Sequence, residues 1–265
     1  MLFNIGHLFY PRPPESKRII FYMVLSYSMK PCFLAINLVL PRWLRNALPG
    51  RAWLAVWLLL FSACSNPTQN TERVFRMSIG AEPPTLDWSL ATDGVSFDII
   101  NNIMEGLTQY DSNLQPAPAV AEKWEFSDDG KTLTFHLRND VYWTDGKPVT
   151  AMDFEYSWKR LLNPATAAEY AYFLFDVENA YEYNSGKLKD PSQVGVQALS
   201  PTLLQVRLKH PVAYFPSITT FMVTFPQRED IISRYGVHWI DPGNIVTNGA
   251  FTLSEWHHEY KLVLT

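Results

Sequence analysis

The clearest alternation of apolar and polar positions lies in residues 131–138, which read KTLTFHLR. On an extended chain, the apolar side chains of Leu133, Phe135 and Leu137 share one face. The polar side chains between them share the other face. This two-residue period predicts a half-buried antiparallel strand.

A turn signal precedes that strand. Asp128-Asp129-Gly130 reads as a tight turn, because Gly130 can take a positive φ without steric cost. On the incoming side, Trp124 and Phe126 occupy alternate positions. We therefore predict a hairpin with an aromatic inner face. Val141 and Trp143 begin another extended run, which Asp145-Gly146 ends in a second turn.

The period changes to that of a helix after Thr150. Phe154, Trp158 and Leu161 recur at helical spacing, and Asp153 follows Thr150 by three residues in a pattern like a capping box. Asn163-Pro164 ends the helix. Three charged residues of this helix are expected to stay in water: Glu155, Lys159 and Arg160.

The remaining pattern predicts a mixture of strands and helices. Strands are expected at residues 74–79, 194–198, 203–208, 251–256 and 260–264. Helices are expected at residues 96–104, 178–185 and 228–235, the last two followed by glycine.

The N-terminal segment has the pattern of an export signal. Three arginines precede AWLAVWLLLFSAC at residues 52–64, an apolar run shorter than the roughly 20 residues of a membrane-spanning helix. Phe61-Ser62-Ala63-Cys64 is similar to a bacterial lipoprotein signal, although Phe61 stands where leucine is usual. A lipid on Cys64 would tether the chain to the outer side of a membrane, with residues 64–73 as a flexible linker. The alternative is an ordinary cleaved signal.

The first 40 residues are more than such a signal needs. Met23 or Met29 is a candidate for the true start, so that residues 1–63 include signal and lead together. A second hydrophobic anchor is the rival interpretation, but the apolar runs are short and are broken by Pro31 and Pro41.

Composition narrows the class of protein. The 265 residues are 47% hydrophobic and 14% aromatic, which suits one or two domains with a sizeable core. Residues 1–63 hold seven basic residues and one acidic residue. Subtracting these from the totals of 22 and 26 leaves 15 basic and 25 acidic residues, a formal charge of −10. Residues 64–265 therefore lack the excess of basic residues that nucleic-acid binding requires. The two cysteines, Cys32 and Cys64, both lie in the N-terminal segment, so residues 65–265 contain none.

The sequence contains no recognisable catalytic or metal-binding motif. The sequence has no G-x-S-x-G, phosphate loop or H-E-x-x-H. His257 and His258 are adjacent on an expected strand, so they would point to opposite faces. We expect no cofactor and no metal.

Residues 121–160 resemble the oligopeptide/dipeptide-binding family of extracytoplasmic solute-binding proteins, the receptors of ATP-driven peptide importers. The motifs that carry this resemblance are Ala121 with Trp124, TFHLR at 134–138, WTDGKPVTA at 143–151, Asp153-Phe154 and SWKR at 157–160. Thr85-Leu86-Asp87 and Glu105-Gly106-Leu107 extend it upstream, and PVAYF at 211–215 and NIVTNGA at 244–250 extend it downstream. It spans residues 73 to 265.

The resemblance implies an α/β, periplasmic-binding-protein-like fold in which two lobes clamp the ligand. Residues 71–104 and 229–265 are expected to form an incomplete first lobe, and residues 105–228 an inserted β-rich α+β domain. The second lobe is missing, which predicts that this chain is a truncated fragment and that it does not bind alone.

The resemblance also implies where a ligand lies. The peptide-facing segment of the first lobe corresponds to Thr92, Asp93, Gly94 and Val95, where Gly94 would let a peptide backbone approach closely. Tyr170 corresponds to a ligand-facing tyrosine of the inserted domain. A plain loop and ordinary core packing are the respective alternatives.

The function implied is non-enzymatic: capture of extended oligopeptides outside the cytoplasmic membrane for an ABC importer, in the periplasm or at the cell surface. The implied partners are an oligopeptide ligand, the permease subunits in the membrane, and the membrane itself through Cys64, with no nucleic acid. One alternative is a family member that binds nickel, haem or a sugar. Another is a secreted glycoside hydrolase, because Tyr142 and Trp143 lie near paired acids.

Overall fold

The computed structural model describes residues 75, 76 and 78–265. From Ser78 onward these residues belong to one compact unit with a continuous hydrophobic core. The strand predicted at residues 74–79 is wrong for the residues described there, because 75, 76, 78 and 79 lie in no helix or strand. A strand requires a partner, and no ladder among the described residues includes this segment.

The first described helix is α2, Gly94–Ile103. It begins two residues earlier than predicted, because Asp93 caps it by accepting from the Ser96 backbone N–H at 2.9 Å. Ile99, Ile100 and Ile103 are buried along one side. Two short antiparallel strands follow, β1 (Thr108–Tyr110) and β2 (Pro116–Pro118).

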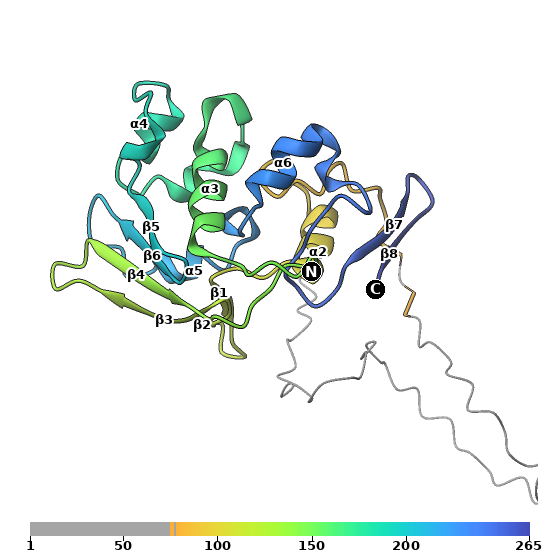
Figure 1. Cartoon of the computed structure of the whole chain (residues 1–265), viewed down its shortest axis with the longest axis horizontal. Coiled ribbons are helices and arrows are strands. Elements are labelled where there is room, and N and C mark those ends of the chain that lie inside the picture. Colours follow the sequence, from red (N-terminus) through yellow and green to blue (C-terminus); the bar gives the residue numbers. More distant parts are fainter. Residues whose placement is uncertain (1–74, 77) are drawn as a thin grey trace, which may run out of the picture. The chain divides into compact units, whose positions relative to one another are not determined.

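A four-stranded antiparallel sheet has the order β3-β4-β6-β5 (Figure 1). Its strands are β3 (Ala121–Phe126), β4 (Thr132–Leu137), β5 (Val196–Ser200) and β6 (Leu203–Arg207). The predicted hairpin between β3 and β4 is confirmed, with Gly130 at φ +68°. Trp124 packs on Phe135 at 6.4 Å between ring centroids, whereas Phe126 is exposed.

Helix α3, Ala151–Leu162, covers the β5 and β6 part of this sheet. The capping box is present: the Asp153 carboxylate accepts from the Thr150 backbone N–H at 2.8 Å. The three apolar side chains predicted to face the core are fully buried: Phe154, Trp158 and Leu161. The sheet supplies the facing layer through Leu133, Phe135, Leu204 and Val206. Asn163 ends the helix, as predicted.

Short helices connect α3 to the end of the chain. In order they are η1 (Pro164–Thr166), η2 (Glu169–Leu174), α4 (Ala180–Asn184), η3 (Pro191–Gln193), α5 (Phe215–Ile218), η4 (Met222–Thr224), α6 (Glu229–Tyr235) and η5 (Gly236–Ile240). The predicted helices at 178–185 and 228–235 are therefore confirmed in shortened form.

The predicted strands near the C-terminus form the antiparallel hairpin β7 (Leu253–His257) and β8 (Lys261–Leu264). The hairpin binds the Glu82 carboxylate through three donors: the Trp256 indole N–H of β7 at 2.7 Å and, from the turn, the His258 ring at 2.9 Å and the Glu259 backbone N–H at 2.9 Å. Within residues 75–265, apart from Met77, no helix is long and apolar enough to cross a membrane.

Candidate ligand-contact site

The segment from Thr92 to Val95 links a buried residue, Ala91, to the start of α2. Thr92 and Gly94 are exposed, and Val95 is half-buried. The Asp93 carboxylate is engaged locally, because it accepts from both the backbone N–H and the hydroxyl of Ser96, at 2.9 and 2.6 Å. Its side chain therefore fixes the helix start, and the exposed residues of the segment are Thr92 and Gly94.

Gly94 leaves open space at the surface. A Cβ added there would meet nothing within 4 Å, and its φ is outside the left-handed region. The position therefore does not need glycine for its own packing. Glycine there keeps the surface in front of Thr92 and Val95 free of a side chain.

Tyr170 lies in η2 and reaches the same place. Its hydroxyl donates to the Thr92 carbonyl oxygen at 3.4 Å, across 78 residues of sequence. The structure thus brings together the two segments that the sequence predicted as ligand-facing. This long hydrogen bond is partly exposed.

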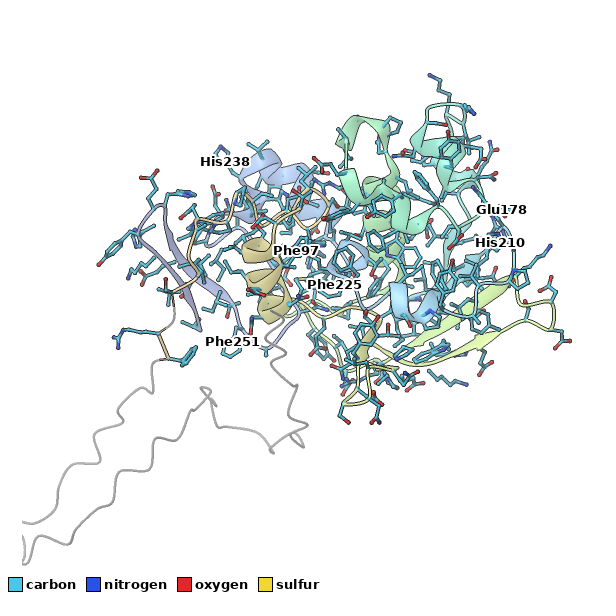
Figure 2. All side chains as sticks on the ribbon, turned by 180° about the vertical axis from the view of Figure 1, so that it is seen from behind. Phe97, Glu178, His210, Phe225, His238 and Phe251 are labelled. Carbon is cyan, nitrogen blue, oxygen red and sulfur yellow. The ribbon has the colours of Figure 1, made fainter. Side chains whose placement is uncertain are left out.

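Tyr170 belongs to an aromatic cluster drawn from three parts of the chain. Its ring lies 6.1 Å from that of Phe97 on α2, 5.8 Å from Phe173 on η2 and 5.8 Å from Phe221. Tyr172 is the most exposed member at 54% and stacks on Phe173 at 4.7 Å. Phe97, labelled in Figure 2, lies on α2 and is half-buried. The cluster offers an apolar surface beside the exposed residues Thr92 and Gly94.

An ion pair with little solvent exposure joins α3 to Asp87, five residues before Thr92. Arg160 of α3 holds Asp87 through two hydrogen bonds, at 2.9 and 2.6 Å, and the two side chains are only 17% and 6% exposed. The prediction that Arg160 stays in water is wrong, because the buried Asp87 carboxylate requires a charged partner. Gln227 and Trp239 also contact Asp87, at 3.4 Å each.

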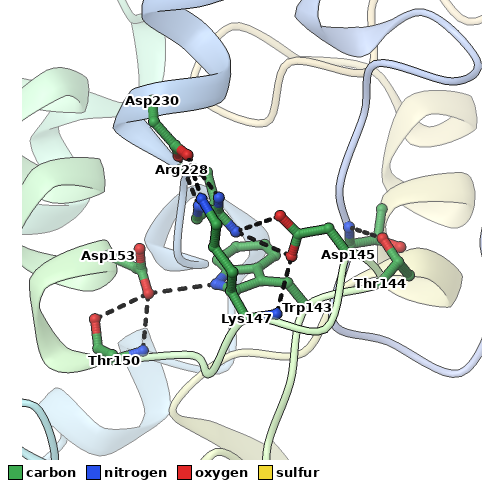
Figure 3. A network of polar contacts seen from close by, with 9 residues as sticks. Trp143, Thr144, Asp145, Lys147, Thr150, Asp153, Arg228 and Asp230 are labelled. Carbon is green, nitrogen blue, oxygen red and sulfur yellow. Dashed lines mark hydrogen bonds and ion pairs between the residues drawn. The ribbon is translucent and has the colours of Figure 1, made fainter.

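A second polar network explains the WTDGKPVTA motif (Figure 3). The Arg228 side chain is 6% exposed and binds both Asp145 and Asp230, while its guanidinium lies 5.8 Å from the centre of the Trp143 ring. Hydrogen bonds from Arg228 lower the pKa of Asp230 well below its ordinary value. The network joins the turn at Asp145-Gly146 to the start of α6.

Asp153 belongs to the same network, but its pKa is shifted in the direction opposite to that of Asp230. Its carboxylate accepts from Thr150 and from the Trp143 indole at 3.3 Å. Burial nevertheless raises the pKa of this carboxyl, against the hydrogen bonds that lower it. These contacts make Asp153 part of the capping box that starts α3.

The NIVTNGA motif, residues 244–250, packs against the C-terminal end of α2. Asn248 exchanges two hydrogen bonds with the Glu105 backbone, at 3.0 and 3.1 Å. Gly249 donates to the Ile103 carbonyl at 2.9 Å, and a Cβ on Gly249 would lie 2.4 Å from the Ile103 carbonyl carbon. Only glycine fits there, so this motif holds the end of α2.

Metal binding finds no support within the described part of the chain, where no group of three or more His, Cys, Asp or Glu side chains could hold an ion. His257 pairs with Glu255, and His258 with Glu82. Cys64, the predicted lipidation site, lies outside the described residues.

Sequence reasoning missed Phe97, Phe173 and Phe221 as neighbours of Tyr170. The run EYAYF at 169–173 was a usable signal, because such a density of aromatic residues is unusual for a short solvated helix. Phe221 carried no comparable signal, since its place beside Tyr170 depends on how η4 packs.

The chain matches known proteins over most of its described length. Residues 115–265 match the family described as bacterial extracellular solute-binding proteins, family 5 Middle. The dipeptide-binding protein DppE of Bacillus subtilis is 39% identical over 73% of this chain and 35% of its own length. The probable deoxycholate-binding periplasmic protein YgiS of Escherichia coli is 37% identical over 70% of this chain and 35% of its own length.

A solved structure agrees in fold. Haemophilus influenzae OppA in complex with the peptide RPPGFSPFR is 38% identical and superposes with a TM-score of 0.67 over 70% of this chain and 36% of that chain. The chain thus spans about a third of the length of the relatives that it matches. The resemblance of residues 121–160 is confirmed, and the family consists of solute-binding proteins, not enzymes. The chain belongs to the bacterial extracellular solute-binding proteins of family 5.

Proposed function

We propose that this chain is the N-terminal part of the receptor of an ABC peptide importer, and that it captures extended oligopeptides outside the cytoplasmic membrane. The observation that carries this proposal is the contact between Tyr170 and Thr92, which places an aromatic cluster beside the exposed residues Thr92 and Gly94. A surface of this kind suits sequence-tolerant recognition, because every peptide offers the same N–H and C=O groups.

The arrangement of lobes belongs to the same proposal. Residues 71–104 and 229–265 would form part of the first lobe, and residues 105–228 the inserted domain, with the ligand closed in by a second lobe. A clamp gains affinity when its lobes close, so a single lobe presents only half of the contacts. Binding is therefore tested on the complete gene product.

The direct test is a calorimetric titration of that protein with a mixture of tri- to pentapeptides. Tyr170→Phe removes one hydroxyl and should weaken peptide binding about fivefold, the usual effect of one hydrogen bond. Tyr170→Ala also removes the ring and should weaken it further. Tyr260→Phe is the control, because Tyr260 is 82% exposed between β7 and β8 and does not belong to the aromatic cluster. Peptide binding that is unchanged in Tyr170→Ala would refute the site.

A different solute is the second candidate, and one observation favours keeping it. YgiS, a relative at 37% identity, is described as a probable deoxycholate-binding protein. The same titration with deoxycholate, a nickel salt, haem and a disaccharide separates these ligands from peptides. If one of them binds and the peptides do not, the family assignment stands and the peptide proposal fails.

Attachment to the membrane is a separate part of the proposal. A lipidated Cys64 would anchor the chain on the outer surface, near the permease subunits that it serves. Cys64→Ser should move the protein from the membrane fraction to the soluble one. Full retention on the membrane would contradict anchoring through this cysteine.

A further inference from the structure

An open groove of about 610 Å³ lies along α3. Its base is formed by Tyr156, Lys159, Arg160 and Asn163, which recur at three- and four-residue steps along α3. Tyr183 of α4 and Glu229 of α6 also line it. Figure 1 shows α3 between α4 and α6.

Two tyrosines in this groove have uncommitted hydroxyls. Tyr183 is only 7% exposed, yet it lines the groove, and its hydroxyl makes no hydrogen bond to any described residue. The half-buried Tyr156 likewise has no hydrogen-bond partner among the described residues. Neither hydroxyl oxygen is among the fully buried polar atoms that lack a partner, so both reach the open space of the groove and are free to bond to a ligand there.

Charge around the groove is balanced. Lys159 forms an ion pair with Glu155, and Arg160 forms one with Asp87. Glu229 adds one exposed carboxylate at the rim. Burial raises the pKa of Tyr156 and of Tyr183, so both hydroxyls stay protonated and able to donate at neutral pH.

We propose that this groove is a second binding site and that it takes a small uncharged saccharide. A saccharide offers hydroxyls that accept from Tyr156 and Tyr183 and donate to Glu229, and its apolar ring faces suit aromatic walls. A charged ligand fits less well, because the cations that line the groove are already paired. None of these residues belongs to the Thr92–Tyr170 site, and the proposal does not depend on peptide binding.

The test is an NMR titration of the intact protein, carrying ¹³C-labelled tyrosine rings, with maltotriose and with N,N′-diacetylchitobiose. One of the two should shift the resonances of Tyr156 and Tyr183. Tyr183→Phe and Tyr156→Phe keep the rings and should each weaken that binding about fivefold, as expected for one hydrogen bond. Tyr181→Phe is the matched control, because Tyr181 lies on the same helix, is 44% exposed and does not line the groove.

Four results would overturn the proposal. They are no shift with either saccharide, a shift with trialanine but with neither saccharide, binding that survives Tyr183→Phe unchanged, and an equal loss in Tyr181→Phe. Thermal unfolding of each variant checks that the fold is kept. Tyr170→Phe should leave saccharide binding intact, so failure here and failure of the peptide proposal can be told apart.

Discussion

Replacing Arg160 by Gln should destabilise the protein severely, although sequence reasoning placed this residue in water. The change removes two hydrogen bonds to Asp87, whose side chain is 6% exposed, and leaves that carboxylate buried without its cation. Breaking a buried pair from one side costs about 3–5 kcal/mol. That is a large part of the roughly 5–15 kcal/mol that stabilises a typical domain.

The measurement is urea unfolding of the intact protein, followed by tryptophan fluorescence. Trp239 donates to Asp87 at 3.4 Å and Trp88 packs on Trp239 at 4.8 Å, so the signal reports this region. With a slope of about 2 kcal/mol per molar urea, a loss of ~4 kcal/mol lowers the midpoint by about 2 M. Lys123→Gln, which removes one side of an exposed ion pair, is the control and should leave the midpoint unchanged.

A double-mutant cycle separates the pair from its surroundings. Asp87→Asn with Arg160→Gln removes both charges, so the double variant should be more stable than the sum of the single losses predicts. If Arg160→Gln alone shifts the midpoint no more than Lys123→Gln does, or if the two losses simply add, the buried pair does not support the fold in the way argued here.

Three further predictions concern packing, pH and association. Gly249→Ala should cost more than about 1–3 kcal/mol in urea unfolding, because its Cβ would collide with the Ile103 backbone, whereas Gly94→Ala, in open space, should cost nothing measurable. Since the folded pKa of Asp230 is lowered, its ionised form stabilises the fold above the ordinary pKa of 3.8, and this contribution is lost as pH falls below it. Asp230→Asn should therefore flatten the acid limb of stability against pH, and an unaltered limb would count against the Arg228 pairing. Within the described residues β7 and β8 pair only with each other, so residues 65–265 expressed alone should associate in sedimentation analysis, and a monomer that unfolds cooperatively would contradict this.

Elements whose apolar period is strong could be predicted from the sequence alone. The strands β4 and β6 and the helix α3 lie where the alternation and the caps placed them, and β5 lies two residues further along the chain than predicted. The segment at 74–79 has a similar apolar content, but its described residues form no strand. A period states which face can be buried, and it does not supply the neighbour that buries it.

In the candidate site too, the sequence predicted the local features, and the packing of distant segments decided the contacts between them. The motifs of residues 121–160 were enough to identify the family, because several of them occur in the right order, and they proved to be scaffold: caps, turns and a buried ion network. The resemblance named Thr92 and Tyr170, but their contact depends on how η2 packs against α2.

The sequence by itself determined the local elements, the caps and the membership of a family, since these depend on neighbours within a few residues or on ordered motifs. Only the tertiary structure decided that Arg160 is buried against Asp87, that Gly249 must be glycine, and that Tyr156 and Tyr183 share a groove. Each of these depends on atoms from distant parts of the chain, and long-range packing leaves no period in the sequence from which it could be predicted.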